Sequence, residues 1–171
     1  VGVPQDNDGM RMDLLEKTLA KLAKRGRKPK FIYVVPDFQN PSGVTMTLER
    51  RKRLLELAHE YDVPIIEDSP YRDLRFAGEF VPMICSLDTE NYVIALGTFS
   101  KLLCPGLRLA WITTHTDWIE RMVAAKQSMD LSSPIFTQLI VAEYLRRGLL
   151  PQQVAKIREL YAKKRGVMLD A

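Results

Sequence analysis

A single lysine between two apolar runs is the residue best placed to do chemistry. Lys101 lies in the stretch 97–111 (GTFSKLLCPGLRLAW), with small hydroxyl residues before it and Arg108 seven positions after it. Lysine is rarely buried unless it is paired or reactive, so a lysine at such a junction needs an explanation. In its neutral form, a lysine amine condenses with an aldehyde. The pattern therefore marks Lys101 as a candidate for covalent chemistry.

Two other polar motifs stand directly after apolar runs. Asn40 follows the run at 31–35, within a turn that contains two prolines and a glycine, and Asp68 ends the run at 63–68. In open α/β sheets the functional site lies at the carboxyl ends of the strands. We therefore expect Asn40, Asp68 and Lys101 to meet at one edge of a sheet, and this convergence is stronger evidence than any single motif.

Apolar periodicity predicts the elements that position these residues. Strands are expected at 31–35, 63–68, 92–96 and 107–113, helices at 12–22, 47–61, 118–123, 134–147 and 151–167, and a loop with one helical turn at 72–90. This alternation predicts an α/β fold, built as a three-layer open sheet. Only about ten residues separate the last two strands, too few for a parallel crossover. The last strand is therefore expected to be antiparallel in an otherwise mostly parallel sheet.

Composition and charge are those of an ordinary globular protein. The 171 residues are 46% apolar and 27% charged, which suits one domain with a sizeable core, and the net charge is +4. Basic residues cluster at 50–53 and 163–165, both within predicted helices. We interpret both clusters as solvated helix faces rather than as a nucleic-acid surface. On the helix at 47–61, the residues expected to be buried are Leu54, Leu57, Ala58 and Tyr61.

Cysteine usage and apolar runs bear on the cellular compartment. Cys85 and Cys104 have no metal-ligand spacing and form no disulfide framework, which favours a reducing, cytoplasmic location, and no metal is expected. No signal peptide and no run of transmembrane length are present, so no membrane association is expected. The chain begins at Val1 without a methionine and ends within a helical pattern, so we expect it to be a piece of a longer protein.

The sequence TFSK, followed by PGLRLAW, resembles the cofactor-lysine segment of the class I/II aminotransferases, the fold-type I enzymes that use pyridoxal 5'-phosphate (PLP). The most similar branch holds the aminoadipate/kynurenine-type aminotransferases and the aminotransferase-like domains of MocR regulators. The resemblance covers most of the chain and is densest from 38 to 111. It implies that residues 1–171 form part of the PLP-binding large domain, without the upstream phosphate loop and the downstream small domain. It also implies a homodimer for the full-length protein.

The resemblance implies roles for an amine and a carboxylate. Lys101 is implied to form the Schiff base with PLP and to move the proton between the substrate α-carbon and the cofactor. Asp68 is implied to keep the pyridine nitrogen protonated, so that the ring accepts electrons released at the substrate carbon. Glu67 alternates to the other face of the strand and is the weaker candidate for this role. Simpler interpretations also stand: an exposed lysine at Lys101, and a helix cap or solvent-facing strand end at Asp68.

The resemblance also implies partners for the oxygen atoms of the cofactor. Asn40 and Tyr71 are the implied donors to its phenolic oxygen. Asn40 stands in NPSG where the family has NPTG, and it could equally be a turn former. Thr98, Ser100 and Arg108 are implied to bind the phosphate, for which hydroxyl groups and a guanidinium fork are suited donors.

The activity implied by the resemblance is the transfer of an amino group between an amino acid and a 2-oxo acid. Two alternatives remain open. One is a MocR-type transcriptional regulator that senses PLP or an amino compound, and the other is a fold-type I lyase or decarboxylase. A regulator would carry a DNA-binding module before Val1, and only then would nucleic acid be a partner. The side chain of the substrate is not predicted.

Overall fold

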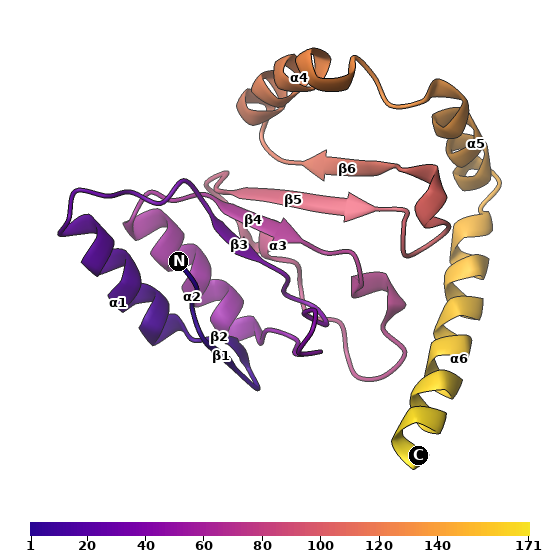
Figure 1. The fold of residues 1–171 in the computed structure, drawn as a ribbon, viewed down its shortest axis with the longest axis horizontal. Helices are drawn as coiled ribbons and strands as arrows, with labels where there is room; N and C mark the ends of the chain where they lie inside the picture. Colours follow the sequence, from indigo (N-terminus) through magenta and orange to yellow (C-terminus); the bar gives the residue numbers. More distant parts are fainter. The chain divides into compact units, whose positions relative to one another are not determined.

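A computed structural model describes residues 1–171, which divide into two compact units. Unit 1 consists of Val1–Ser69, Val81–Leu96 and Ile112–His115, and unit 2 consists of Pro70–Phe80, Gly97–Trp111 and Thr116–Ala171. In chain order the elements are β1 (Gln5–Asp6), β2 (Gly9–Met10), α1 (Met12–Ala23), β3 (Ile32–Val34), α2 (Leu48–Glu60), β4 (Ile65–Asp68), η1 (Arg72–Leu74), α3 (Ile84–Leu87), β5 (Val93–Thr98), η2 (Pro105–Leu107), β6 (Ala110–Thr113), α4 (Thr116–Asp130), α5 (Ile135–Arg146) and α6 (Leu149–Asp170), where η marks a 3₁₀ turn (Figure 1).

The main sheet is an open, mixed sheet with the strand order β3-β4-β5-β6. β3, β4 and β5 run parallel, and their register pairs Ile32 with Ile65 and Ile65 with Val93. Apolar and β-branched residues fill these strands because such side chains pack well on a pleated surface. The three predicted strands are confirmed, and the third extends further than expected, to Thr98. The α/β class and the mostly parallel sheet are confirmed with them.

β6 runs antiparallel to β5, as Figure 1 shows. Thr114 Oγ1 donates a hydrogen bond to the Val93 carbonyl (3.0 Å), and the Phe99 N–H donates to the Leu109 carbonyl (3.1 Å). Residue numbers therefore rise on one strand as they fall on the other, and the antiparallel prediction is confirmed. The predicted start of this strand is too early, because Pro105–Leu107 forms the η2 turn instead. Leu107 ends this turn and Arg108 follows in a left-handed conformation (φ 51°), which is not a strand conformation.

The core of unit 1 lies between the helices and one face of the sheet. Its buried apolar residues include Met12, Leu15 and Leu19 of α1, Leu54, Leu57 and Ala58 of α2, and Ile32, Val34, Ile65 and Val93 of the strands. The face predicted for α2 is thereby confirmed, except that Tyr61 is only partly buried. Tyr61 is the residue at which the chain leaves the helix, so its side chain lies at the margin of the core.

The two faces of this sheet have different surroundings. Ile32, Val34 and Ile65 point into the core that α1 and α2 cover. Because side chains alternate along a strand, Tyr33 and Asp68 lie on the opposite face. Tyr33 is 50% exposed, whereas its neighbours Ile32 and Val34 are buried. The Tyr33 hydroxyl and the Asp68 carboxylate therefore lie on the face away from these helices, whereas Glu67 lies on the buried face.

Glu67 is buried and has a structural role. Its carboxylate accepts hydrogen bonds from the N–H groups of Ile84 and Cys85, both at 2.9 Å, at the start of α3. The first N–H groups of a helix lack partners within it, so a carboxylate stabilises them. The stretch 72–90, predicted as a loop with one helical turn, contains two short helical segments, η1 and α3. Glu67 fixes the second of them to the end of β4.

Unit 2 has a smaller core. It consists of Leu74, Leu102 and Val154, with Leu150 and Ile157 packed against them. Along α5 only Val141 is buried, whereas Phe136 and Leu139 are 76% and 64% exposed. None of the helices combines the length and apolar character that crossing a bilayer requires.

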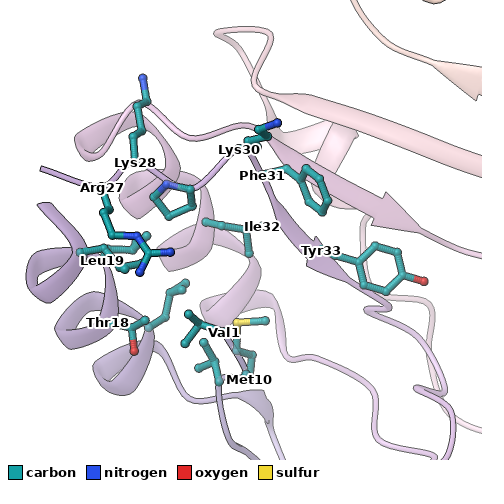
Figure 2. Close-up of a pocket in the computed structure, with 15 residues that line it drawn as sticks. Val1, Met10, Thr18, Leu19, Arg27, Lys28, Lys30, Phe31, Ile32 and Tyr33 are labelled. Carbon is teal, nitrogen blue, oxygen red and sulfur yellow. The ribbon is translucent and has the colours of Figure 1, made fainter. Parts of the chain in front are cut away.

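An open cavity of about 570 Å³ lies on unit 1 between the first residues of the chain, α1 and β3 (Figure 2). Apolar side chains such as Leu19 and Ile32 line it, with the basic side chains of Arg27 and Lys28 beside them. None of the predicted site residues lines this cavity. One lining residue, Tyr33, donates a hydrogen bond to the predicted site residue Asp68.

Candidate active site

The lysine segment follows directly on the end of β5. A backbone hydrogen bond from the Leu103 N–H to the Phe99 carbonyl (2.9 Å) closes a turn around Lys101. Within this turn Leu102 is buried in the core of unit 2, and Lys101 is exposed. The Lys101 Nζ lies 6.0 Å from the centroid of the Tyr71 ring. Unit 2 thus brings together the amine and the phenol that the sequence singles out.

Two hydroxyl groups predicted to bind phosphate are adjacent. Thr98 Oγ1 and Ser100 Oγ are hydrogen-bonded at 3.0 Å, and the Ser100 N–H donates to Thr98 Oγ1 at 3.1 Å. Thr98 Oγ1 also lies 3.2 Å from the Leu109 carbonyl, to which it can donate. This arrangement fixes both hydroxyl groups between β5 and Lys101. Hydroxyl groups can turn to donate to an anion, so the pair suits a phosphate.

Arg108 has an unusual backbone conformation. Its φ is 51° and its ψ is 37°, which lie in the left-handed region that non-glycine residues rarely adopt. Its side chain is exposed, and its Nη1 donates to the Pro105 carbonyl at 3.2 Å. A guanidinium that is exposed and held at one nitrogen keeps other donors for an anion.

Asp68 closes β4 in unit 1, where it is paired in register with Leu96 of β5. Its Oδ2 accepts a hydrogen bond of 2.6 Å from the Tyr33 hydroxyl. The next residue, Ser69, has a buried Oγ without a hydrogen-bond partner. Sequence reasoning missed Tyr33, although strand alternation and the parallel register place it on the face that carries Asp68.

Asn40 stands in a tight loop that the side chain of Gln39 organises. Gln39 Nε2 donates to the Asn40 carbonyl at 2.7 Å, and the Ser42 N–H and hydroxyl both donate to Gln39 Oε1. The Gln39 N–H donates to the Val44 carbonyl at 2.9 Å. The Asn40 side chain is exposed at the tip of this loop.

A buried arginine ties both ends of the Asn40 loop to α2. Arg51 is fully buried, and its Nη2 forms an ion pair with Asp37 Oδ1 at 3.0 Å. It donates to the carbonyls of Pro36 and Met46 at either end of the loop, and to that of Pro82 before α3. Buried charges persist in proteins when they are paired and hydrogen-bonded in this way.

The prediction that residues 50–53 form a solvated basic face is wrong for two of the four. Arg51 is fully buried, and the Arg50 side chain is only 19% exposed. Arg50 donates to the carbonyls of Gly9 and Met10 and to Asp6 Oδ2, all at 2.8 Å. Carbonyl groups of distant segments satisfy both guanidinium groups, and a helical pattern alone does not reveal such partners.

The seven predicted site residues are divided between the units. Unit 2 holds Tyr71, Thr98, Ser100, Lys101 and Arg108. Unit 1 holds the other two, which are Asp68 at the end of β4 and Asn40 in the loop after β3. The expected meeting of these two groups with the lysine stays a prediction.

In this sheet the lysine turn follows the third parallel strand, β5, and a carboxylate stands at the end of the second, β4. The family model for aminotransferase class I and II matches residues 2–171, so the chain belongs to that family. The resemblance noted from the sequence is thereby confirmed.

Individual relatives are similar over nearly the whole chain. Aromatic-amino-acid aminotransferase 1 of Thermococcus litoralis is 49% identical over 171 residues, which cover all of this chain and 41% of that protein. The crystal structure of a multiple substrate aminotransferase from Thermococcus profundus has a TM-score of 0.95 at 48% identity, covering 99% of this chain and 42% of that one. The Pyrococcus horikoshii kynurenine aminotransferase has a TM-score of 0.96 at 45% identity, with the same coverage. The chain thus spans about two fifths of the length of these relatives.

Proposed function

We propose that this chain is part of a PLP-dependent aminotransferase that moves an amino group between an amino acid and a 2-oxo acid. The observation that carries the proposal is the grouping of Lys101 with Tyr71 beside the paired hydroxyl groups of Thr98 and Ser100, in a member of the aminotransferase family. Relatives that are 45–49% identical are named as aminotransferases, whereas two HTH-type transcriptional regulators of Bacillus subtilis match the chain at 35% and 30% identity. This difference in identity favours an enzyme over a regulator.

The donor set fits PLP, which has a phosphate, a phenolic oxygen, a ring nitrogen and an aldehyde. Thr98, Ser100 and Arg108 would hold the phosphate, since two hydroxyl groups and a guanidinium offer several donors for one dianion. Asn40 and Tyr71 would donate to the phenolic oxygen. The unpartnered, buried Ser69 Oγ next to Asp68 is a further polar group that a bound molecule could satisfy.

When bound, PLP supplies an aldehyde that reacts with amines and a ring that accepts the electrons released at the substrate α-carbon. Lys101 would hold the cofactor through its Nζ and would move a proton at the substrate α-carbon. Asp68 would keep the ring nitrogen protonated by accepting its N–H. Tyr71 would share its hydroxyl hydrogen with the phenolic oxygen and so stabilise negative charge there.

The partners of the full-length protein are proposed on the same basis. They are an amino acid, a 2-oxo acid and a second copy of the chain in a homodimer. Two relatives are named for aromatic amino acids and for kynurenine, so aromatic amino acids are the first amino donors to test. A reducing, cytoplasmic location is proposed because Cys85 and Cys104 are both free thiols.

Borohydride trapping in the full-length protein tests the proposal. Incubation with PLP should give an absorbance band, and reduction should fix the cofactor onto Lys101, where peptide mass spectrometry can locate it. Lys101→Ala should abolish both the trapped adduct and transamination. Lys163→Ala, which removes an exposed lysine on α6, should change neither. Transamination that persists in Lys101→Ala would contradict the proposal.

A further inference from the structure

The face of the sheet that carries Asp68 also carries a tyrosine of the neighbouring strand. Tyr33 of β3 is paired in register with Ile66 of β4, and Asp68 is two residues further along β4 on the same face. A long side chain on one strand can reach this diagonal position on the next. The Tyr33 hydroxyl does so and donates to Asp68 Oδ2 at 2.6 Å.

This hydrogen bond engages only one of the two carboxylate oxygens of Asp68. Oδ2 is occupied by Tyr33, and at 2.6 Å the O–H to carboxylate contact lies in the short range of charge-assisted bonds. This hydrogen bond restrains the orientation of the Asp68 carboxylate. Oδ1 keeps its lone pairs for another donor.

Packing does not account for the hydroxyl group of Tyr33. Phe31 stands two residues earlier on the same face of the same stretch, is also 50% exposed, and fills its place without a hydroxyl. Figure 2 shows the Tyr33 ring extending away from the cavity residues Leu19 and Ile32, with its oxygen at the far end. The ring would suit the strand equally well as phenylalanine, and the hydroxyl group serves the contact with Asp68.

We propose that Tyr33 is a positioning residue for Asp68, which it holds through Oδ2 so that Oδ1 is presented to the ring N–H of PLP. The inference rests on the proposed function, since it assigns Asp68 to the ring nitrogen. Tyr33 itself does not touch the cofactor in this arrangement. It acts by restricting the carboxylate to one orientation before the cofactor binds, which lowers the entropic cost of binding.

A double-mutant cycle on PLP affinity in the full-length protein tests the inference. Equilibrium dialysis gives the dissociation constant of PLP for the wild-type protein, Tyr33→Phe, Asp68→Ala and the double variant. Tyr33→Phe should weaken PLP binding about tenfold, the size expected for a hydrogen bond to a charged group. In the Asp68→Ala background the same substitution should have almost no effect, because the group through which Tyr33 acts is gone.

A matched control separates this role from a general effect of removing a phenol. The Tyr92 hydroxyl donates to Asp62 Oδ1 at 3.0 Å, so Tyr92→Phe deletes an exposed tyrosine–aspartate hydrogen bond that involves no predicted site residue. Tyr92→Phe should leave the affinity for PLP unchanged. Thermal unfolding of the apo variants shows whether they are folded, and Tyr33→Met serves as a second hydroxyl-free variant.

The outcomes distinguish this inference from the proposed function. A wild-type protein that binds no PLP overturns the proposed function and this inference with it. If the wild-type protein binds PLP and Tyr33→Phe binds it equally tightly, only the role of Tyr33 is overturned. A loss in Tyr33→Phe that persists undiminished in the Asp68→Ala background also overturns it, because Tyr33 would then act independently of Asp68.

Discussion

At the scale of single residues, a glycine next to the lysine segment leaves room for a tryptophan ring. A Cβ atom added at Gly97 would stand 2.2 Å from ring atoms of Trp111, far inside van der Waals contact. The Trp111 ring also packs against that of Phe99, with centroids 4.8 Å apart. Gly97 therefore lets an indole lie directly on the backbone of β5, beside the turn that carries Lys101.

Gly97→Ala is expected to destabilise the protein by about 1–3 kcal/mol, because the Trp111 ring, which is 42% exposed, must be displaced from the backbone to admit the added Cβ. The reason is steric, so the loss should shrink when Trp111 is also replaced by alanine. Urea unfolding of the two single variants and the double variant measures this coupling.

Gly166→Ala is the control for this substitution. Apart from its chain neighbours and the backbone of its own helix, no atom lies within 4 Å of the position of its added Cβ, and the residue stands within α6. Alanine favours a helix interior over glycine by about 1 kcal/mol, so this variant should be slightly more stable than the wild type. If both glycine variants behaved alike, the steric account of Gly97 would be wrong.

At the scale of elements, Arg51 is the residue through which α2 holds two loops. It binds the carbonyls that begin and end the loop carrying Asn40, and the carbonyl of Pro82 ahead of α3. Glu67 holds the start of α3 from the other side. The geometry of the Asn40 loop thus depends on one side chain that lies outside the predicted site.

Arg51→Met is expected to lower the free energy of unfolding by about 3–5 kcal/mol, because it removes one partner of a buried ion pair. Lys52→Met changes the neighbouring exposed residue of the same helix and should have little effect. Denaturant unfolding compares the two variants. Hydrogen exchange at Gly43 and Val44 should become faster in Arg51→Met, since their amide groups lie in the loop that it releases. Equal stability of Arg51→Met and Lys52→Met would contradict this role.

Local sequence signals predicted the elements better than the contacts between them. The short separation before the last strand correctly gave its antiparallel direction, and the residue types around Lys101 correctly indicated the family. The burial of Arg51 was not predictable, because its partners come from three segments that only the folded chain brings together. The contact of Tyr33 with Asp68 likewise depends on the register of β3 against β4, which neither strand specifies alone.

At the scale of the whole molecule, the carboxylates with displaced pKa values all favour the ionised form. Hydrogen bonding to Arg50 lowers the pKa of Asp6, and hydrogen bonding to Arg11 lowers that of Asp13. The pKa of Asp62 is lowered by its hydrogen bonds to Lys28 and then to Tyr92. In unit 2, hydrogen bonds from Arg146 and then Arg147 lower the pKa of Glu143.

These shifts predict that the protein is less stable in acid. A carboxyl group whose pKa is lower in the folded state contributes stability above its unfolded pKa of about 4 and loses that contribution as the pH falls through the folded value. The free energy of unfolding should therefore fall most steeply below about pH 4. Urea unfolding of the full-length protein between neutral pH and pH 3 measures this dependence.

The response to salt and one substitution test whether these ion pairs cause the loss of stability in acid. Most of the pairs that shift these pKa values lie at the surface, as in the ion pair of Lys28 with Asp62, whose side chains are 58% and 71% exposed. The exception is the partner of Asp6, because the Arg50 side chain is only 19% exposed. Exposed pairs are screened by salt, so the acid dependence should become shallower in about 1 M sodium chloride, where the Debye length is about 3 Å. Asp62→Asn should remove part of the dependence without abolishing it, because three other carboxylates still contribute. A pH dependence that salt leaves unchanged would contradict an origin in these exposed ion pairs.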